Sequence, residues 1–435
     1  MAKKLLPRLF GFELLMAPYA VAHLKLGLLL KETGYQCQSE QRLGIYLTNT
    51  LEEAFKKSEQ LAGFNEYIVE EANAAAEIKK EKPIMVVLGN PPYSGVSANA
   101  SVRVVLDPKT GKPRQELTWI GQLIEDYKVV DGQPLRERKH WLQDDYVKFI
   151  RFGQWRIKET GGGILAFITN HGYLDNPTFR GMRQSLLNTF RDIYIINLHG
   201  NVKKKETAPD GGTDENVFDI QQGVAIGIFV KEMDKEGPAK VHYADMWGTR
   251  DSKYEALSDG DIGTTTWMEL APNSPFYFFV PRHEELRPEY EKGWKITEIF
   301  PVNSTGIVTA RDHFVIDFEP EPIRRRIEVF FDKGLGDAEV KEKLSLAENY
   351  AWRVSEARKQ LMAVKNWESF FKEILYRPFD VRPIYYHPSV VWRTRDNVMR
   401  HMLAGDNLGL CTNREVNGDF RHVLCSRDLI NDCTV

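Results

Sequence analysis

Four consecutive residues, Asn90, Pro91, Pro92 and Tyr93, carry the strongest chemical signal in this sequence. They follow an apolar run at residues 83–88, which predicts a buried strand. Each proline fixes its own backbone and restricts the residue before it, so the turn holds the Asn90 amide and the Pro91 carbonyl rigidly. Ligands of open α/β sheets bind at the carboxyl ends of the strands. Two adjacent acceptors suit an exocyclic amino group, and Tyr93 offers a flat face on which a flipped base can stack.

The elements that position these residues alternate between strand and helix over the first 230 residues, which is typical of a parallel α/β sheet. Strands are predicted at 9–14, 43–47, 163–169, 192–198 and 223–230, and helices at 18–31, 51–63, 141–159 and 179–190. Residues 96–138 are polar and rich in turns, which indicates a long insertion. From about residue 240 we expect short strands and turns (as in 240–247 and 274–282), a helical stretch (321–372), an aromatic and arginine-rich junction (376–386) and a strand-like tail (408–435).

Composition sets outer bounds on function. With 435 residues and 42% hydrophobic content, the chain can form two or three domains. No apolar run is long enough to span a membrane, and the four cysteines have neither metal-ligand nor disulfide-framework spacing, so we expect a cytoplasmic protein without a metal site. The net charge is −3, so a DNA partner requires clustered basic residues. Candidates are residues 203–205 (three lysines) and Arg393, Arg395 and Arg400.

The Asn-Pro-Pro-Tyr segment resembles the amino-methylating DNA methyltransferases, specifically the N6-adenine enzymes that use S-adenosylmethionine. The resemblance extends to three further positions, in the expected order. Glu13 ends the first strand, where the family places an acidic residue on the cofactor's ribose hydroxyls. Asn49 follows the second strand, where the family usually has an aspartate that accepts from the cofactor's adenine, and an asparagine can accept there without a charge. Phe218 precedes a later strand, where the family has a phenylalanine that stacks on the flipped base opposite Tyr93.

The resemblance implies a mechanism without metal or covalent intermediate. The lone pair of an adenine amino group is delocalised into the ring, so the nitrogen is a poor nucleophile. Asn90 and the Pro91 carbonyl accept its two hydrogens and favour a tetrahedral nitrogen whose lone pair points at the sulfonium methyl. Catalysis then consists of positioning and electrostatic stabilisation.

More widely, residues 5–435 resemble the methyltransferase region of single-polypeptide type ISP restriction-modification enzymes. In those enzymes one chain also carries a nuclease and a translocating ATPase, and the partner is double-stranded DNA. The resemblance implies a Rossmann-like methyltransferase domain over residues 1–280. Residues 281–435 then form a helical coupler and the start of a target-recognition region.

One family feature has no counterpart in the sequence. The glycine-rich cofactor loop, of Asp-Pro-x-x-Gly-x-Gly type, normally precedes the acidic strand, and we expect it and the first strand before residue 1. Two alternatives stay open. The chain could be a non-catalytic DNA-binding or assembly module, or it could methylate a protein amide, because glutamine N5-methyltransferases also carry Asn-Pro-Pro-Tyr. The compactness of the latter enzymes disfavours that reading.

Overall fold

The computed structural model describes most of the chain in ten stretches. The described residues are 4–35, 42–53, 64–93, 97–107, 110–135, 140–204, 206–233, 237–349, 351–413 and 423–434. They divide into two units, Met1–His283 and Glu284–Val435. Within the described stretches, no helix combines the length and the apolar character needed to cross a membrane.

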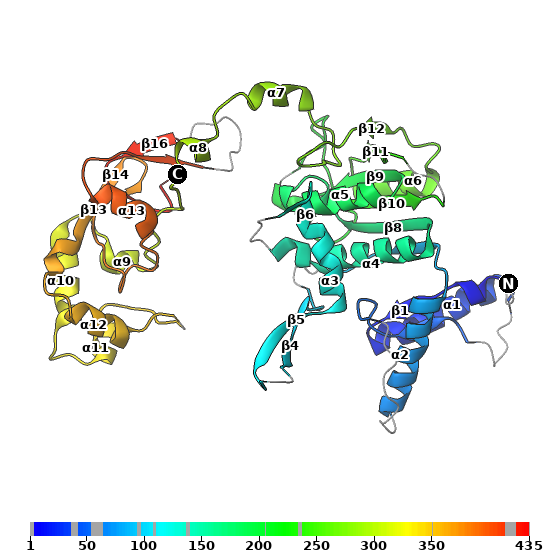
Figure 1. Ribbon diagram of the computed structural model, residues 1–435, viewed down its shortest axis with the longest axis horizontal. Coiled ribbons are helices and arrows are strands. Elements are labelled where there is room, and N and C mark those ends of the chain that lie inside the picture. The colour runs from blue at the N-terminus through cyan, green and yellow to red at the C-terminus, as the bar shows by residue number, and fades with distance from the viewer. Residues whose placement is uncertain are drawn as a thin grey trace. The chain divides into compact units, whose positions relative to one another are not determined.

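The first unit is built on a mixed six-stranded sheet with the spatial order β12–β11–β9–β10–β8–β3 (Figure 1). Its strands are β3 (Val86–Gly89), β8 (Gly163–Asn170), β9 (Asp192–His199), β10 (Val224–Lys231), β11 (Lys240–Asp245) and β12 (Met268–Leu270). β3 runs parallel to β8, and β11 runs parallel to β9. β10 is antiparallel to both β8 and β9, and β12 is antiparallel to β11.

The predicted all-parallel sheet is therefore wrong at β10. A parallel neighbour requires a long crossover, usually through a helix packed on the sheet. Between β9 and β10 the described chain forms only one short 3-10 turn, Val202–Lys204, so β10 returns alongside β9 in the opposite direction. The predicted strands at 163–169, 192–198 and 223–230 are themselves confirmed.

Two predicted helices of this unit are also confirmed, as α4 (Asp145–Thr160) and α5 (Arg180–Thr189). Apolar residues of α4, such as Val147 and Ile150, share one core with Leu165 of β8 and Phe229 of β10. Gly161 ends α4 in the left-handed region (φ 93°), which a glycine adopts without steric cost. Two further helices are α3 (Trp119–Glu125) and α6 (Arg250–Asp259).

The N-terminal part of the first unit forms a separate two-stranded parallel sheet of β1 (Gly11–Glu13) and β2 (Ile45–Leu47). Helices α1 (Met16–Glu32) and α2 (Phe64–Glu81) accompany it. The predicted helix at 51–63 lies outside the described residues from 54 onward. α2 follows that stretch and was not predicted.

The strand before Asn90 differs from expectation. β3 pairs only with β8 among the described strands, and Val86 and Leu88 are 55% and 75% exposed. The apolar run predicts a strand covered on both faces. In the structure β3 is instead an edge strand, because burial depends on neighbours that the run itself does not specify.

The predicted insertion at 96–138 contains its own small elements. The hairpin of β4 (Val102–Leu106) and β5 (Pro113–Leu117) stands out from α3 (Figure 1). A smaller hairpin joins β6 (Val129–Val130) and β7 (Gln133–Pro134).

The described residues of the second unit pack around one large apolar core. Ile327 and Phe330 of α10 pack there with Leu361 of α12 and Ile384 of β14. The helices are α7 (Arg287–Tyr290), α8 (Ile296–Ile299), α9 (Asp312–Val315), α10 (Pro320–Phe331), α11 (Asp337–Lys343), α12 (Val354–Met362) and α13 (Asp396–Leu403). The strands are β13 (Phe371–Arg377), β14 (Asp380–Tyr385), β15 (Gly409–Thr412), β16 (Val423–Ser426) and β17 (Leu429–Ile430).

Three expectations for this part of the chain have definite outcomes. The helical stretch at 321–372 is broken into α10, α11 and α12, and the strand-like tail is confirmed. Short strands and turns were predicted for 240–247 and 274–282, and the structure has β11 in the first segment and turns and irregular backbone in the second.

Candidate functional site

The Asn-Pro-Pro-Tyr segment lies directly at the carboxyl end of β3. Asn90 is exposed, Pro91 is buried, and Tyr93 is half-buried. Among the described residues, no hydrogen bond is formed by the Asn90 amide or by the Pro91 carbonyl. Residues 94–96, which follow, lie outside the described stretches. Both groups lie at the end of a strand, which is where ligands of open α/β sheets bind.

The structure brings Tyr93 and Phe218 together, although 125 residues separate them. Their ring centroids are 5.7 Å apart and the rings are tilted by 55°. Both rings pack on the apolar cluster that includes Leu198 and Val224, and the Tyr93 hydroxyl donates to the Ile168 carbonyl (3.3 Å). Burial raises the pKa of Tyr93, so the phenol stays protonated. A base between two parallel rings needs about 7 Å, twice the ~3.4 Å stacking distance, so the rings must part to admit one.

Phe218 is held by the asparagine two residues before it. The Asn216 side-chain oxygen accepts from the Phe218 N–H (2.9 Å), while its NH₂ group donates to the carbonyls of Gly200 (3.0 Å) and Gln222 (2.7 Å). The Asn216 side chain thus ties both ends of the 200–222 loop to the residue that presents the ring.

A buried ion pair anchors the same loop to α6. Lys253 is fully buried, and its ammonium group donates to Asp214 (2.6 Å) and to the carbonyls of Leu198 and Glu215 (both 2.7 Å). Asp214 also accepts from the N–H of Gly200 (2.7 Å) and from a second backbone N–H on the turn before α6. All three ammonium hydrogens are used, so this charge is paired and fully hydrogen-bonded.

A polar network, which the sequence did not reveal, lies at the ends of β8, β9 and β11, and all its members but Asp245 are buried. His171 Nδ1 contacts the Asn197 side-chain oxygen (3.1 Å), and the Asn197 NH₂ group donates to the Tyr243 hydroxyl (3.1 Å). Tyr243 donates to Asp245, which also contacts His199 Nε2 (2.6 Å). Burial lowers the pKa of His171, so the imidazole is favoured over the imidazolium. The sequence feature that could have indicated this network is the position of its residues, since each lies near the carboxyl end of a strand.

The two predicted cofactor residues lie at neighbouring strand ends. β1 and β2 are parallel, with Glu13 in register with Leu47, so Glu13 and Asn49 share one edge of the small sheet. One carboxylate oxygen of Glu13 accepts from the N–H groups of Leu14 (2.9 Å) and Leu15 (3.2 Å). Its other oxygen forms no hydrogen bond with the described residues and is free to accept one.

Asn49 connects this edge to the chain that follows Tyr93. Its NH₂ group donates to the Asn99 side-chain oxygen (2.8 Å), and its own oxygen accepts from the Leu51 N–H (3.0 Å). The Asn99 NH₂ group in turn donates to Asp145, in the first turn of α4 (3.0 Å). None of these contacts was predicted from the sequence, because they join three segments that are remote along the chain.

Asp145 and Lys148 on α4 hold the segment around Ser97. Asp145 accepts from the Ser97 hydroxyl (2.6 Å) and from the Ala98 N–H (3.2 Å). The Lys148 ammonium donates to the Ser97 hydroxyl (2.7 Å) and to the Asn99 carbonyl. Both charged side chains are buried, and burial lowers the pKa of Lys148. α4 therefore holds residues 97–99, the first described residues after the Asn-Pro-Pro-Tyr segment.

The basic residues proposed for DNA contact are spread over both units. Lys203 and Lys204 are exposed on the 200–222 loop, and residue 205 lies outside the described stretches. Arg393 is exposed, and the Arg395 guanidinium donates to the Gly306 carbonyl (3.3 Å).

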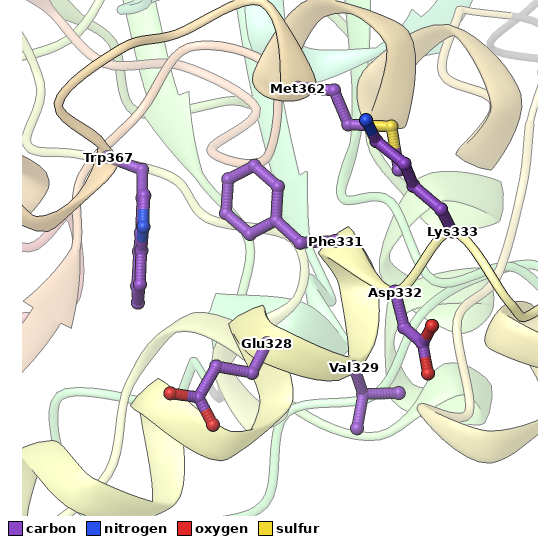
Figure 2. A pocket seen from close by; sticks show the side chains of 7 residues that line it. All are labelled: Glu328, Val329, Phe331, Asp332, Lys333, Met362 and Trp367. Carbon is purple, nitrogen blue, oxygen red and sulfur yellow. The ribbon is translucent and has the colours of Figure 1, made fainter.

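A surface hollow of about 640 Å³ lies in the second unit, beside the C-terminal end of α10 (Figure 2). Phe331 and Trp367 meet there at a centroid distance of 5.4 Å, and the carboxylates of Glu328 and Asp332 flank them. It contains none of the predicted site residues. Its carboxylates disfavour contact with a phosphate backbone.

Residues 298–435 match the family model of the Type ISP C-terminal specificity domain. This region forms most of the second unit. No curated protein matches the chain in sequence.

Three solved structures share the fold. The ATP-dependent Type ISP restriction-modification enzyme LlaBIII bound to DNA is 21% identical over 97% of this chain, with a TM-score of 0.61. The DrdV–DNA complex is 23% identical over 97%, with a TM-score of 0.61. A nuclease-deletion mutant of the Type ISP enzyme LlaGI, in complex with a DNA substrate mimic, is 23% identical over 90%, with a TM-score of 0.58. The chain covers 28%, 41% and 32% of these three proteins, respectively.

Proposed function

We propose that this chain is the methyltransferase region, with the beginning of the target-recognition region, of a restriction-modification enzyme. It transfers a methyl group from S-adenosylmethionine to the N6 nitrogen of an adenine in double-stranded DNA. The observation that carries the proposal is the combination, at one sheet edge, of the Asn90 and Pro91 acceptors, which form no hydrogen bond with the described residues, and the Tyr93–Phe218 ring pair. The DNA in the titles of the LlaBIII, DrdV and LlaGI structures supports the choice of partner.

Asn90 and Pro91 take the catalytic role in this proposal. Their oxygens accept the two hydrogens of the adenine amino group, which withdraws the nitrogen lone pair from the ring and directs it toward the methyl donor. Because the Pro-Pro turn is rigid, the acceptors need no reorganisation as charge develops on the nitrogen.

Tyr93 and Phe218 hold the flipped base. Aromatic stacking contributes about 1–3 kcal/mol per base, which offsets part of the cost of extruding adenine from the duplex. The rings contact each other in this structure, so the base enters by displacing one of them. Tyr93 follows a rigid Pro-Pro turn and its hydroxyl is hydrogen-bonded to Ile168, so we assign the movement to the side chain of Phe218.

The residues at the β1–β2 edge fit the nucleoside half of S-adenosylmethionine. The free carboxylate oxygen of Glu13 suits a ribose hydroxyl, as in dinucleotide-binding sheets. The Asn49 side-chain oxygen has a second lone pair that can accept from an adenine amino group. The cofactor supplies an electrophilic methyl group on sulfur.

The proposal also includes the domains that act together with this chain. LlaBIII is described as ATP-dependent and the LlaGI variant as a nuclease deletion, and this chain covers less than half of either protein. We therefore propose nuclease and ATPase domains of the same polypeptide as its partners.

Transfer of tritiated methyl groups from S-adenosylmethionine to DNA tests the proposal. Asn90→Ala should lower the rate by about 100-fold or more, the usual cost of removing one preorganised polar group from a transition state. The matched control is Asn188→Ala, an exposed asparagine on α5, which should leave the rate unchanged. Equal rates for Asn90→Ala and the unsubstituted protein would contradict the assignment.

A second candidate, a DNA-binding module without methyl transfer, is favoured by the specificity-domain match over residues 298–435. Under that alternative the protein binds DNA, takes up no S-adenosylmethionine and transfers no label. Calorimetric titration with S-adenosylmethionine separates the two candidates, because only the methyltransferase binds it.

A further inference from the structure

The arginine-rich junction at 376–386 forms a stack in which aromatic rings and guanidinium groups alternate. The Arg382 guanidinium carbon lies 3.9 Å from the Phe318 ring centroid and 4.6 Å from that of Tyr376. The Arg377 guanidinium carbon lies 3.9 Å from the Tyr376 centroid on the next layer. A backbone bridge between Ile316 and β14 places Phe318 at the outer end of this stack. Phe318 is 72% exposed, so the stack ends in an uncovered ring.

Phe379 occupies the tip of the same hairpin. β13 ends at Arg377 and β14 begins at Asp380, so Pro378 and Phe379 form a two-residue loop. Phe379 is 89% exposed and has a φ of 62°, in the left-handed region. Hairpin loops usually place glycine or asparagine at such positions, because a side chain there is strained. The fold requires neither the exposed ring nor the strain, and this combination is typical of a residue kept for function.

The charges around the hairpin separate a stacking surface from a phosphate-binding surface. Within the stack, Arg382 is paired with Asp380 (2.7 Å), and the Tyr376 hydroxyl donates to Asp312 (2.8 Å), so this part is close to neutral. The faces of its rings and guanidinium groups suit the faces of bases rather than phosphates.

The neighbouring strands supply the positive charge. Arg377 donates to Asn431, which pairs with Ile307, and the following Val308 pairs with Arg393. Within the described stretches, neither Arg377 nor Arg393 forms an ion pair, and Arg393 is exposed. A polyanion that carries flat apolar rings, which is double-stranded DNA, complements both parts of this surface.

We infer that Phe379 is a wedge that inserts between adjacent base pairs of double-stranded DNA, with Phe318 beside it as a stacking platform. The choice of DNA as the partner rests on the proposed function, whereas the wedge is independent of the Asn90 site. Phenylalanine wedges of this kind unstack one base step and kink the duplex.

Phe379→Gly is the decisive variant, because it removes the ring and also relieves the left-handed strain. The probe is a pool of short fluorescein-labelled duplexes of mixed sequence, and binding to the 435-residue chain is followed by fluorescence anisotropy at several salt concentrations. We expect the Kd to rise about tenfold or more, as for the loss of one stacked base. The slope of log Kd against log salt should not change, because no phosphate contact is lost.

Three controls make the result specific. The thermal midpoint of Phe379→Gly should be equal to or above that of the unsubstituted protein. Phe379→Trp should retain binding, and Tyr290→Ala, which removes a ring that is 85% exposed on α7, should leave the Kd unchanged.

A Kd for Phe379→Gly within about twofold of the unsubstituted value overturns the wedge, since a stacked base contributes more than that. Failure of the unsubstituted protein to bind any duplex overturns it as well, and leaves a protein as the partner of this surface. Duplex binding tests the wedge and methyl transfer tests the Asn90 site, so failure of the wedge and failure of the methyltransferase assignment give different results.

Discussion

Replacement of Lys253 by methionine should destabilise the first unit by about 3–5 kcal/mol. The substitution keeps the length of the side chain but leaves the Asp214 carboxylate buried without its counter-charge, which costs about 3–5 kcal/mol in proteins. The contacts of Lys253 place the expected loss of stability near the upper end of that range. The ammonium group also satisfies the Leu198 and Glu215 carbonyls, and each of these loses a hydrogen bond. Among the described residues, Asp214 keeps two donors, both backbone N–H groups.

Urea unfolding monitored by tryptophan fluorescence measures the loss of stability. Trp247 is a suitable probe, because it precedes Gly248, whose N–H donates to Asp214. The two units can unfold separately, so the comparison uses the transition that the substitution shifts. Lys158→Met, on the exposed face of α4, is the matched control and should shift it by less than about 0.5 kcal/mol.

The double variant Asp214→Asn/Lys253→Met decides whether the reasoning holds. Removal of both charges eliminates the unpaired carboxylate, so the double variant should be more stable than Lys253→Met alone. If the free-energy losses of the two single variants simply add, or if Lys253→Met costs under about 1 kcal/mol, the buried pair is not what anchors the Phe218 loop.

Two other predictions concern charges near the site. Burial lowers the pKa of His171 in the folded protein, so below about pH 6.5 the unfolded chain takes up a proton that the folded chain refuses, and stability falls as the pH is lowered. His171→Gln should therefore flatten the change in urea midpoint between about pH 7.5 and about pH 5.5, and an unchanged slope would exclude His171 as its source. Asp145→Asn should lower the thermal stability by about 1–3 kcal/mol, because the Ser97 hydroxyl and the Ala98 N–H lose a charged acceptor. A loss below about 0.5 kcal/mol would show that Asp145 does not hold this segment.

The sequence predicted the strands of the large sheet better than their arrangement. Runs such as residues 163–169 and 192–198 consist mainly of apolar and β-branched residues, which is enough to identify a strand. The direction of β10 depends on how the chain returns between β9 and β10, and the apolar pattern contains no information on that. The exposure of β3 was missed for a related reason, because burial of a strand depends on what pairs with it and covers it.

The candidate site was predictable only in part. Tyr93 and Phe218 were connected through the resemblance to adenine methyltransferases, and the structure places their rings in contact; their role stays a prediction. The network around His171 and Asn197 was not predicted, because single polar residues at strand ends do not indicate their partners. The ion pair of Lys253 with Asp214 was missed for the same reason.

The hydrogen bond between Asn49 and Asn99 has a thermodynamic consequence. It joins the edge proposed for the cofactor to the segment that follows the Asn-Pro-Pro-Tyr turn, and Asp145 fixes the far side of Asn99. A ligand that reorients the Asn49 amide alters the hydrogen bonds of Asn99 and thereby the segment at residues 97–99. Under the proposed function, linkage requires that a base bound beside this segment changes the cofactor affinity at Asn49 by the same factor by which the cofactor changes the affinity for the base. The proposed cofactor and base sites are then coupled through a pair of neutral amides, and cofactor affinity measured with and without DNA reports the size of that coupling.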